Sequence, residues 1–188
     1  NYFAASTTVS FIIQKATPVI TLAVPQNAIY NATPQRATAT ITGVSGVPGT
    51  NLENGLFFAP VYSYPGSGIG VVPTDARTYN VSVSYVGGTN YNSVNASATY
   101  AISPALLSVV SDANPSTAAA DVFYKAVGAA DPLFTVRVSG LQGTDSAASV
   151  LSGSTSRTPG EAVGTYAVNR GTLVSNTNYT VSFTPGLL

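Results

Sequence analysis

The sequence contains no Cys, no His, no Met and no Trp, and only 7% of its 188 residues are charged. Without Cys the chain cannot form disulfides or use a thiolate nucleophile, and without His it lacks the commonest general base and metal ligand. The two lysines, Lys15 and Lys125, are not accompanied by a Gly-x-Ser-x-Gly motif. We therefore expect no enzymatic activity, no catalytic residue and no cofactor.

Charge and hydropathy argue against further classes of partner. Seven Lys and Arg residues balance seven Asp and Glu residues, so the chain lacks the basic surplus typical of nucleic-acid binding. The acidic residues are scattered singly and form no Asp-x-Asp-x-Asp pattern, so we expect no metal site. No apolar run approaches the roughly 18 residues of a membrane-spanning helix, and no membrane span is predicted.

Short stretches in which apolar and polar residues alternate run through the whole sequence. In residues 77–85, the apolar Tyr79, Val81 and Val83 recur at every second position, which places them on one face of a strand. The same alternation recurs in residues 17–25, 36–44, 55–64, 106–112 and 132–140. Gly and Pro turn signals separate these stretches. The pattern predicts an all-β fold built as an antiparallel β-sandwich.

An Asn-Tyr pair occurs three times, beginning at residues 1, 90 and 178, so successive pairs are separated by 89 and 88 residues. This nearly constant spacing predicts an internal repeat. Each repeat has about the length of an immunoglobulin-like sandwich. We predict two tandem immunoglobulin-like modules, residues 17–105 and 106–188, with a boundary near Pro104. So short a connection favours modules stacked end to end.

Residues 106–188 contain the segments "FYKAVGAADPLFTVRVSGLQGTDS", "LSGSTSRTPGEAVGTYAVNRGTL" and "NYTVSFTPG". Through these segments they resemble a known family, the mostly bacterial glycine-rich domain called MBG, of the YGX type, although Lys125 stands where this family usually has Gly after Tyr. Residues 17–105 are similar to a related bacterial Ig-like repeat, through "RTYNVSVSYVGGTNYN" and "ATYAISPA". The resemblance implies tandem modules in large secreted or surface proteins, often adhesins, and therefore an extracellular or bacterial cell-surface location.

The two ends of the sequence are expected to carry complementary features, a surplus strand at the start and an incomplete strand at the end. The closing strand of the first module lies 9 to 12 residues after Asn90, and the same offset from Asn178 gives 187 to 190, so the last strand of the second module is predicted to be truncated. Residues 1–16 look like a closing strand with no module before it. In residues 6–14, Val9, Phe11 and Ile13 alternate as such a strand requires.

We therefore predict that residues 6–14 of one copy complete residues 106–188 of the next, giving a head-to-tail assembly. The alternative is that this sequence is one stretch of a longer array of repeats. In that case an adjacent repeat of the same chain supplies the strand covalently. In either case the predicted partners are copies of the chain or neighbouring repeats.

The aromatic residues suggest a second kind of site. Phe58, Tyr62 and Tyr64 share one parity within residues 55–64, so they are a candidate binding platform for a surface glycan or protein; packing in a core is the alternative. Tyr79 and Tyr166 each follow Thr at the start of a strand, as the tyrosine corner of Ig-like folds does.

Several charged residues are expected to have local roles. Arg157 and Glu161 flank a Thr-Pro-Gly turn, which brings their opposite charges together. Asp131, before Pro132, is expected to support a turn through nearby backbone N–H groups. Internal Lys-Asn isopeptide crosslinks, which need an apolar site with a neighbouring acid, occur in bacterial Ig-like modules, and only Lys15 or Lys125 could supply the amine here.

Together these features predict a structural stalk or fibre-forming segment of a secreted or surface bacterial adhesin. Two other functions stay open: a carbohydrate- or protein-binding Ig-like adhesion module, and an accessory domain of a large secreted enzyme.

Overall fold

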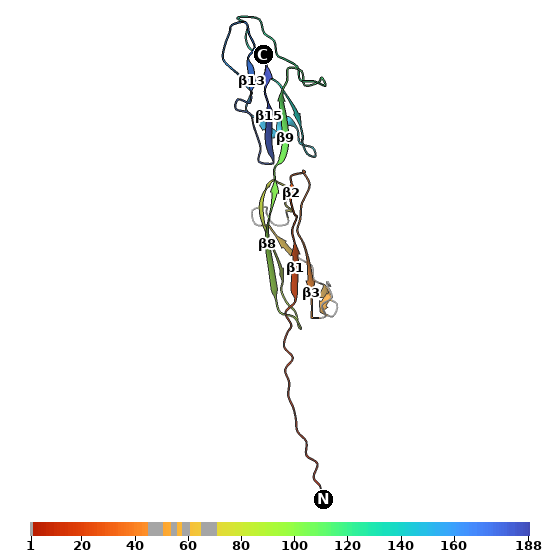
Figure 1. Cartoon of the computed structure of the whole chain (residues 1–188). Helices are drawn as coiled ribbons and strands as arrows, with labels where there is room; N and C mark the ends of the chain where they lie inside the picture. Colours follow the sequence, from red (N-terminus) through yellow and green to blue (C-terminus); the bar gives the residue numbers. More distant parts are fainter. Residues whose placement is uncertain (1, 45–50, 54–55, 58–60, 65–70) are drawn as a thin grey trace. The chain divides into compact units, whose positions relative to one another are not determined.

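The computed structural model describes residues 2–44, 51–53, 56–57, 61–64 and 71–188 (Figure 1). Nearly all regular structure in these residues is β-strand, and their one helix is α1, the single turn Ala147–Val150. The all-β prediction is therefore confirmed. In this part of the chain no helix is both long and apolar enough to cross a membrane.

The chain divides into two compact units by proximity of its residues. Unit 1 contains residues 1–24, 37–70 and 80–98, and unit 2 contains residues 25–36, 71–79 and 99–188. The chain passes from one unit to the other within β7 (Arg77–Tyr85) and within β8 (Val94–Ser103). This division does not test the two predicted repeats, residues 17–105 and 106–188, which stay a prediction.

Unit 1 is built from antiparallel pairs. β1 (Val19–Ala23) pairs with β3 (Thr38–Thr42), β4 (Asn51–Glu53) pairs with β5 (Leu56–Phe57), and β6 (Val61–Ser63) pairs with β7. Ile41 of β3 and Val83 of β7 are fully buried at its centre. Side chains at alternate positions pack around these two, as the period of two predicts: Ile20, Leu22, Ala39, Tyr62, Tyr85 and Val94.

Unit 2 is organised around β9 (Ala105–Ser111), which lies between β10 (Val136–Ser139) and β15 (Tyr179–Thr184). β10 is antiparallel to β9, whereas β15 is parallel to it, a pairing that the sequence prediction did not include. Leu107 and Val109 of β9 are fully buried, consistent with the alternation in its sequence. The remaining pairs are β11 (Leu151–Ser152) with β14 (Val174–Ser175), β2 (Ala28–Ile29) with β8, and β13 (Ala167–Asn169) with both β12 (Ser156–Arg157) and β16 (Gly186–Leu187).

A buried tyrosine pair anchors the Asn178-Tyr179 segment within unit 2. The hydroxyls of Tyr30 and Tyr179 both donate to Oδ2 of Asp145, at 2.9 and 2.7 Å. Burial, together with the hydrogen bond to Asp145, raises the pKa of Tyr30 to about 12. Asn178 accepts a hydrogen bond from the N–H of Ala76 and donates one to Asp75. Tyr179 is therefore part of the core, and the Asn178 side chain bonds to residues far from it in sequence.

Two of the Asn-Tyr pairs have similar neighbours in the structure. Ala16 pairs in parallel with Tyr91, and its N–H donates to the carbonyl of Asn90 at 2.9 Å. Ala105 pairs in parallel with Tyr179, and its N–H donates to the carbonyl of Asn178 at the same distance. Ala16 and Ala105 therefore occupy equivalent places beside their Asn-Tyr pairs.

The two predicted tyrosine corners are also confirmed. The Tyr79 hydroxyl donates to the carbonyl of Asp75 at 2.8 Å, and the Tyr166 hydroxyl donates to the carbonyl of Ala162 at 2.9 Å. In both cases the acceptor lies four residues upstream, as the corner geometry requires. Tyr79 and Tyr166 therefore make the same kind of local contact.

Candidate strand-accepting groove

The last strand of unit 2, β16, is held from both sides. On one side the N–H of Phe123 donates to the carbonyl of Leu187 at 2.9 Å. On the other, Tyr166 and Leu188 exchange two backbone hydrogen bonds of 2.8 Å, and Val168 of β13 pairs with Gly186. β16 thus runs between residues 122–127 and the strand that begins near Tyr166.

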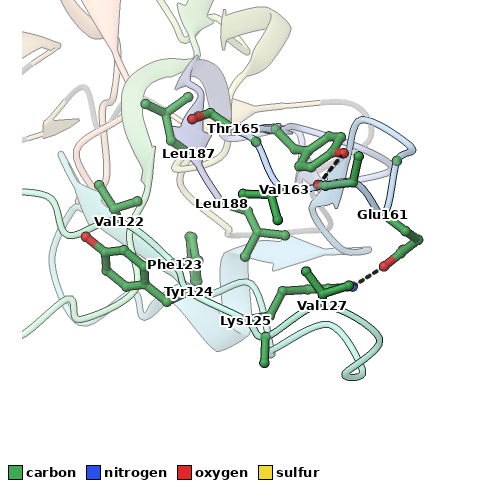
Figure 2. A pocket seen from close by; sticks show the side chains of 15 residues that line it. Val122, Phe123, Tyr124, Lys125, Val127, Glu161, Val163, Thr165, Leu187 and Leu188 are labelled. Carbon is green, nitrogen blue, oxygen red and sulfur yellow. Dashed lines mark hydrogen bonds and ion pairs between the residues drawn. The ribbon is translucent and has the colours of Figure 1, made fainter.

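A groove of about 580 Å³ lies beside β16. Residues 122–127 form one wall and residues 160–166 the other; Leu187 and Leu188 also line the groove, and Leu188 lies between the two walls (Figure 2). Both walls carry apolar side chains that face solvent, notably Tyr124, Val127 and Val163. Such a surface favours the burial of another apolar segment.

The walls also present unused backbone groups. The N–H groups of Lys125 and Gly164 have no hydrogen-bond acceptor among the residues that the structure describes. Neither residue belongs to an assigned strand. Two extended segments with free N–H groups on either side of an apolar groove are a template for an added β-strand.

A buried ion pair fixes the loop that leads into the first wall. Asp112, at the end of β9, is fully buried, and its Oδ1 accepts hydrogen bonds from the backbone N–H groups of Asn114 and Asp121. Its Oδ2 accepts from Nε of Arg137 at 2.8 Å, and Arg137 also donates to the carbonyls of Ala118 and Ala119. The whole loop before Val122 is therefore tied to β9 and β10.

The hydrogen bonds that Asp112 accepts affect its pKa more strongly than its burial does. Burial alone would raise the pKa of this carboxyl, but the N–H groups of Asp121 and Asn114, and then Arg137, hold the pKa below its usual range. The sequence analysis missed this pair. The only sign of this pair in the sequence is an Arg within the alternating stretch of residues 132–140. The sequence does not indicate which acidic residue this Arg contacts.

A ring of four charged side chains connects the two walls near the groove. Lys125 contacts Asp131 at 2.9 Å and Glu161 at 2.8 Å, and Arg157 contacts the same two carboxylates. Figure 2 shows Lys125 reaching across to Glu161. The predicted proximity of Arg157 and Glu161 is confirmed. The carboxylate of Asp131, however, binds Lys125 and Arg157 instead of the backbone N–H groups expected for a turn.

The ring disfavours a covalent crosslink between Lys125 and Asp131, while a Lys-Asn crosslink stays an untested prediction. Hydrogen bonds to Glu161 and Asp131 raise the pKa of Lys125, and those from Arg157 and Lys125 lower the pKa of Asp131. Condensation of the two side chains needs a neutral amine and a protonated carboxyl, so both shifts oppose it. The arrangement is that of an ion-pair network.

One family comparison finds a match. Residues 117–188 match the model of the MBG domain (YGX type). This domain indicates a repeat module of the kind found in bacterial surface and adhesin-like proteins. The comparison does not confirm the related Ig-like repeat predicted for residues 17–105. Neither the curated proteins nor the solved structures gave a match to the chain.

Both walls of the groove lie inside the MBG match, whereas the predicted donor lies outside it. Val9, Phe11 and Ile13 are exposed, and residues 2–15 carry no strand assignment and run as an extended trace (Figure 1). Two residues after Ile13, the side chain of Lys15 donates a hydrogen bond to the carbonyl of Gly88. The structure therefore leaves the predicted donor side chains without contacts in unit 1 and does not show where they bind.

The candidate aromatic platform is only partly described. Tyr62 and Tyr64 stack with ring centroids 6.4 Å apart, and their hydroxyls accept hydrogen bonds from the N–H groups of Ala39 and Ala37. Tyr64 is buried and Tyr62 half-buried, so both rings take part in the packing of unit 1. Phe58 lies outside the described residues, and the platform stays a prediction.

No group of three or more metal-ligating side chains occurs among the described residues. The chemistry that the groove offers is strand pairing and apolar burial.

Proposed function

We propose that this chain is a structural stalk or fibre-forming segment of a secreted or surface-attached bacterial adhesin, with its modules joined end to end. The MBG match of residues 117–188 supports the surface setting. The proposed partners are copies of the chain or adjacent repeats, and the proposed joint is the addition of residues 6–14 to the second module of a neighbour. The proposal includes an extracellular location and no catalysis.

One observation carries the proposal: residues 5–14 correspond in position to β8, yet their apolar side chains are exposed. Because Ala16 is equivalent to Ala105, residues 5–14 are equivalent to β8. The positions of Tyr100 and Ile102 in β8 correspond to Phe11 and Ile13. Tyr100 and Ile102 are 6% and 2% exposed, whereas Phe11 and Ile13 are 81% and 85% exposed.

The energetics favour assembly that depends on concentration. Burying Phe11 and Ile13 contributes about 1.5–3 kcal/mol for each side chain. Association costs at least about 4 kcal/mol in lost translational and rotational freedom. The free energy gained by burial and the free energy lost on association are of similar size. The hydrogen bonds of the added strand therefore decide whether assembly is favourable. We expect chains that assemble at high concentration and separate on dilution.

Light scattering during size-exclusion chromatography tests this proposal. The full chain and a variant lacking residues 1–14 are compared over a range of concentrations. The full chain should show a molar mass that rises with concentration, while the shortened variant stays monomeric at every concentration. Identical monomers in both cases would exclude assembly through this segment.

A further inference from the structure

The predicted boundary between the two modules, near Pro104, lies inside unit 2. This unit contains residues 25–36 and 71–79, which precede the boundary, together with residues 99–188. The MBG match begins only at residue 117. Residues 25–36 and 71–79, which we call the boundary segments, therefore belong to the same compact unit as the MBG domain although they lie outside its match.

A shared carboxylate ties the first boundary segment to the MBG domain. Tyr30 and Tyr179 are 6% and 4% exposed, and the hydroxyls of both donate to Asp145. Their rings also pack edge to face, with centroids 5.4 Å apart. The Tyr179 hydroxyl in turn accepts a hydrogen bond from the N–H of Gln142 at 2.8 Å. Because a buried hydroxyl without a partner costs free energy, this arrangement disfavours separation of Tyr30 from Asp145.

The side chain of Asn178 ties the second boundary segment to the same domain. Its Oδ1 accepts a hydrogen bond from the N–H of Ala76 at 2.7 Å, and its Nδ2 donates to Oδ1 of Asp75 at 3.1 Å. Ala76 is buried, so its N–H depends on this acceptor. Asn178 therefore uses both its acceptor and its donor on two adjacent residues of one boundary segment.

A close contact between Gly143 and Ala32 sets the separation of the two parts. A Cβ atom at position 143 would lie 2.6 Å from the Cβ of Ala32, whereas carbon atoms in contact are about 3.5–4 Å apart. Both residues have positive φ angles, 57° and 59°. Ala rarely adopts this left-handed conformation, so the surrounding structure must hold it there. The two loops are therefore shaped for one close approach, which the missing side chain of Gly143 permits.

We propose that residues 142–145 and 176–179 form a docking face that holds the boundary segments in one fixed orientation, so that the chain does not bend at the predicted boundary near Pro104. The partner of this face is the end of the module that precedes it in the same chain. The inference rests on the proposed stalk function and specifies the joint inside the chain. Contacts at three separate places oppose both bending and twisting, which a single contact does not.

Distances between two spin labels, measured by pulsed electron paramagnetic resonance, test the fixed orientation. The chain has no Cys, so two introduced cysteines can be labelled selectively. Thr78 and Thr184 are exposed, lie in unit 2 and stand on opposite sides of the predicted boundary. The full chain with Thr78→Cys and Thr184→Cys should give one narrow distribution of distances. Dilution with unlabelled chains removes distances between copies.

Glycine substitutions in the labelled chain separate the joint from backbone strain. Gly143→Ala places a methyl group against Ala32 and should shift or broaden the distribution. Gly128→Ala is the matched control, because Gly128 also has a positive φ, of 76°, but an added Cβ there meets nothing within 4 Å. It should leave the distribution unchanged. Combining Gly143→Ala with Ala32→Gly removes the clash and should restore the narrow distribution.

A second variant removes the hydrogen-bonded anchors without adding a clash. Tyr30→Phe combined with Asn178→Ala deletes the side-chain bonds to Asp145, Asp75 and Ala76, and leaves the bond from Tyr179 to Asp145 in place. This anchor variant should also broaden the distribution. Tyr166→Phe is its control, since that hydroxyl bonds only within the MBG domain, and it should not change the distribution.

The outcomes separate the fixed joint from the proposed function. Broadening in Gly143→Ala and in the anchor variant, but in neither control, supports the joint. A broad distribution in the otherwise unchanged chain overturns it, and so does a narrow distribution that persists in both joint variants or equal broadening in the controls. A failure of the chain to self-associate in light scattering contradicts the proposed assembly and leaves the result at this boundary standing.

Discussion

Residues 5–14 correspond in position to β8, but the two segments lie in opposite surroundings. In β8 the inward residues Tyr100 and Ile102 are buried between neighbouring strands, while Phe11 and Ile13 at the same positions are in solvent. The alternation of residues is the same in both. The comparison shows that alternation specifies which face of a strand is apolar. Only the neighbouring strands decide whether that face is buried.

The largest expected contrast lies between Ile102 and Ile13. Ile102→Ala should lower the free energy of unfolding by about 2–5 kcal/mol, because it removes buried methyl groups and leaves a cavity. Ile13→Ala should change it by no more than about 0.5 kcal/mol in dilute, monomeric protein, where that side chain touches nothing. Urea denaturation at low protein concentration measures both, and equal losses would contradict the assignment of residues 5–14 as an unpaired strand.

A smaller contrast is expected between the two tyrosine corners. Tyr79→Phe should cost about 1–2 kcal/mol, because Tyr79 is buried and its loss leaves the carbonyl of Asp75 without this donor. Tyr166→Phe should cost about 0.5 kcal/mol or less, since Tyr166 is only half-buried beside the open groove and water can replace its hydroxyl. Thermal unfolding of the two variants gives the comparison. A larger loss for Tyr166 would show that the groove is closed in solution.

The smallest effect concerns the ion-pair ring beside the groove. Hydrogen bonds from Arg157 and Lys125 hold the pKa values of Asp131 and Glu161 below their usual range. Groups with lowered pKa values stabilise the fold fully above their unfolded values, near 4, and this stability is lost as the pH falls through the lowered folded values.

The wild type should therefore lose slightly more stability between pH 5 and pH 2 than Arg157→Gln, in which part of the ring is absent. Asp131 and Glu161 are 37% and 61% exposed, so solvent and salt screen the difference. Unfolding midpoints of both proteins at each pH measure it. A steeper loss in the variant would contradict the assigned roles of these carboxylates.

Much of the fold was predictable because it follows from local pattern. The period of two located β7 and β9, and the Thr-Tyr sequence located both corners. The parallel pairing of β15 with β9 was not predicted, because a strand's own sequence does not encode the direction of its neighbour.

The candidate site was predicted only as a missing strand. The offset between the Asn-Tyr pairs predicted an incomplete last strand, which stays a prediction, whereas the groove lined by residues 122–127 and 160–166 was not predicted. The pairing of Asp112 with Arg137 and the role of Asp131 depend on contacts between residues many positions apart. Isolated charges in a sequence do not identify such partners.

Amide hydrogen exchange with an added peptide tests the central claim most directly. A peptide with the sequence of residues 6–14 is added to the variant lacking residues 1–14, and exchange is followed at each amide by NMR. Exchange at Lys125 and Gly164 should slow markedly with this peptide and stay unchanged with a control peptide in which Ser replaces Phe11 and Ile13. Unchanged exchange at both amides with saturating peptide would contradict the account.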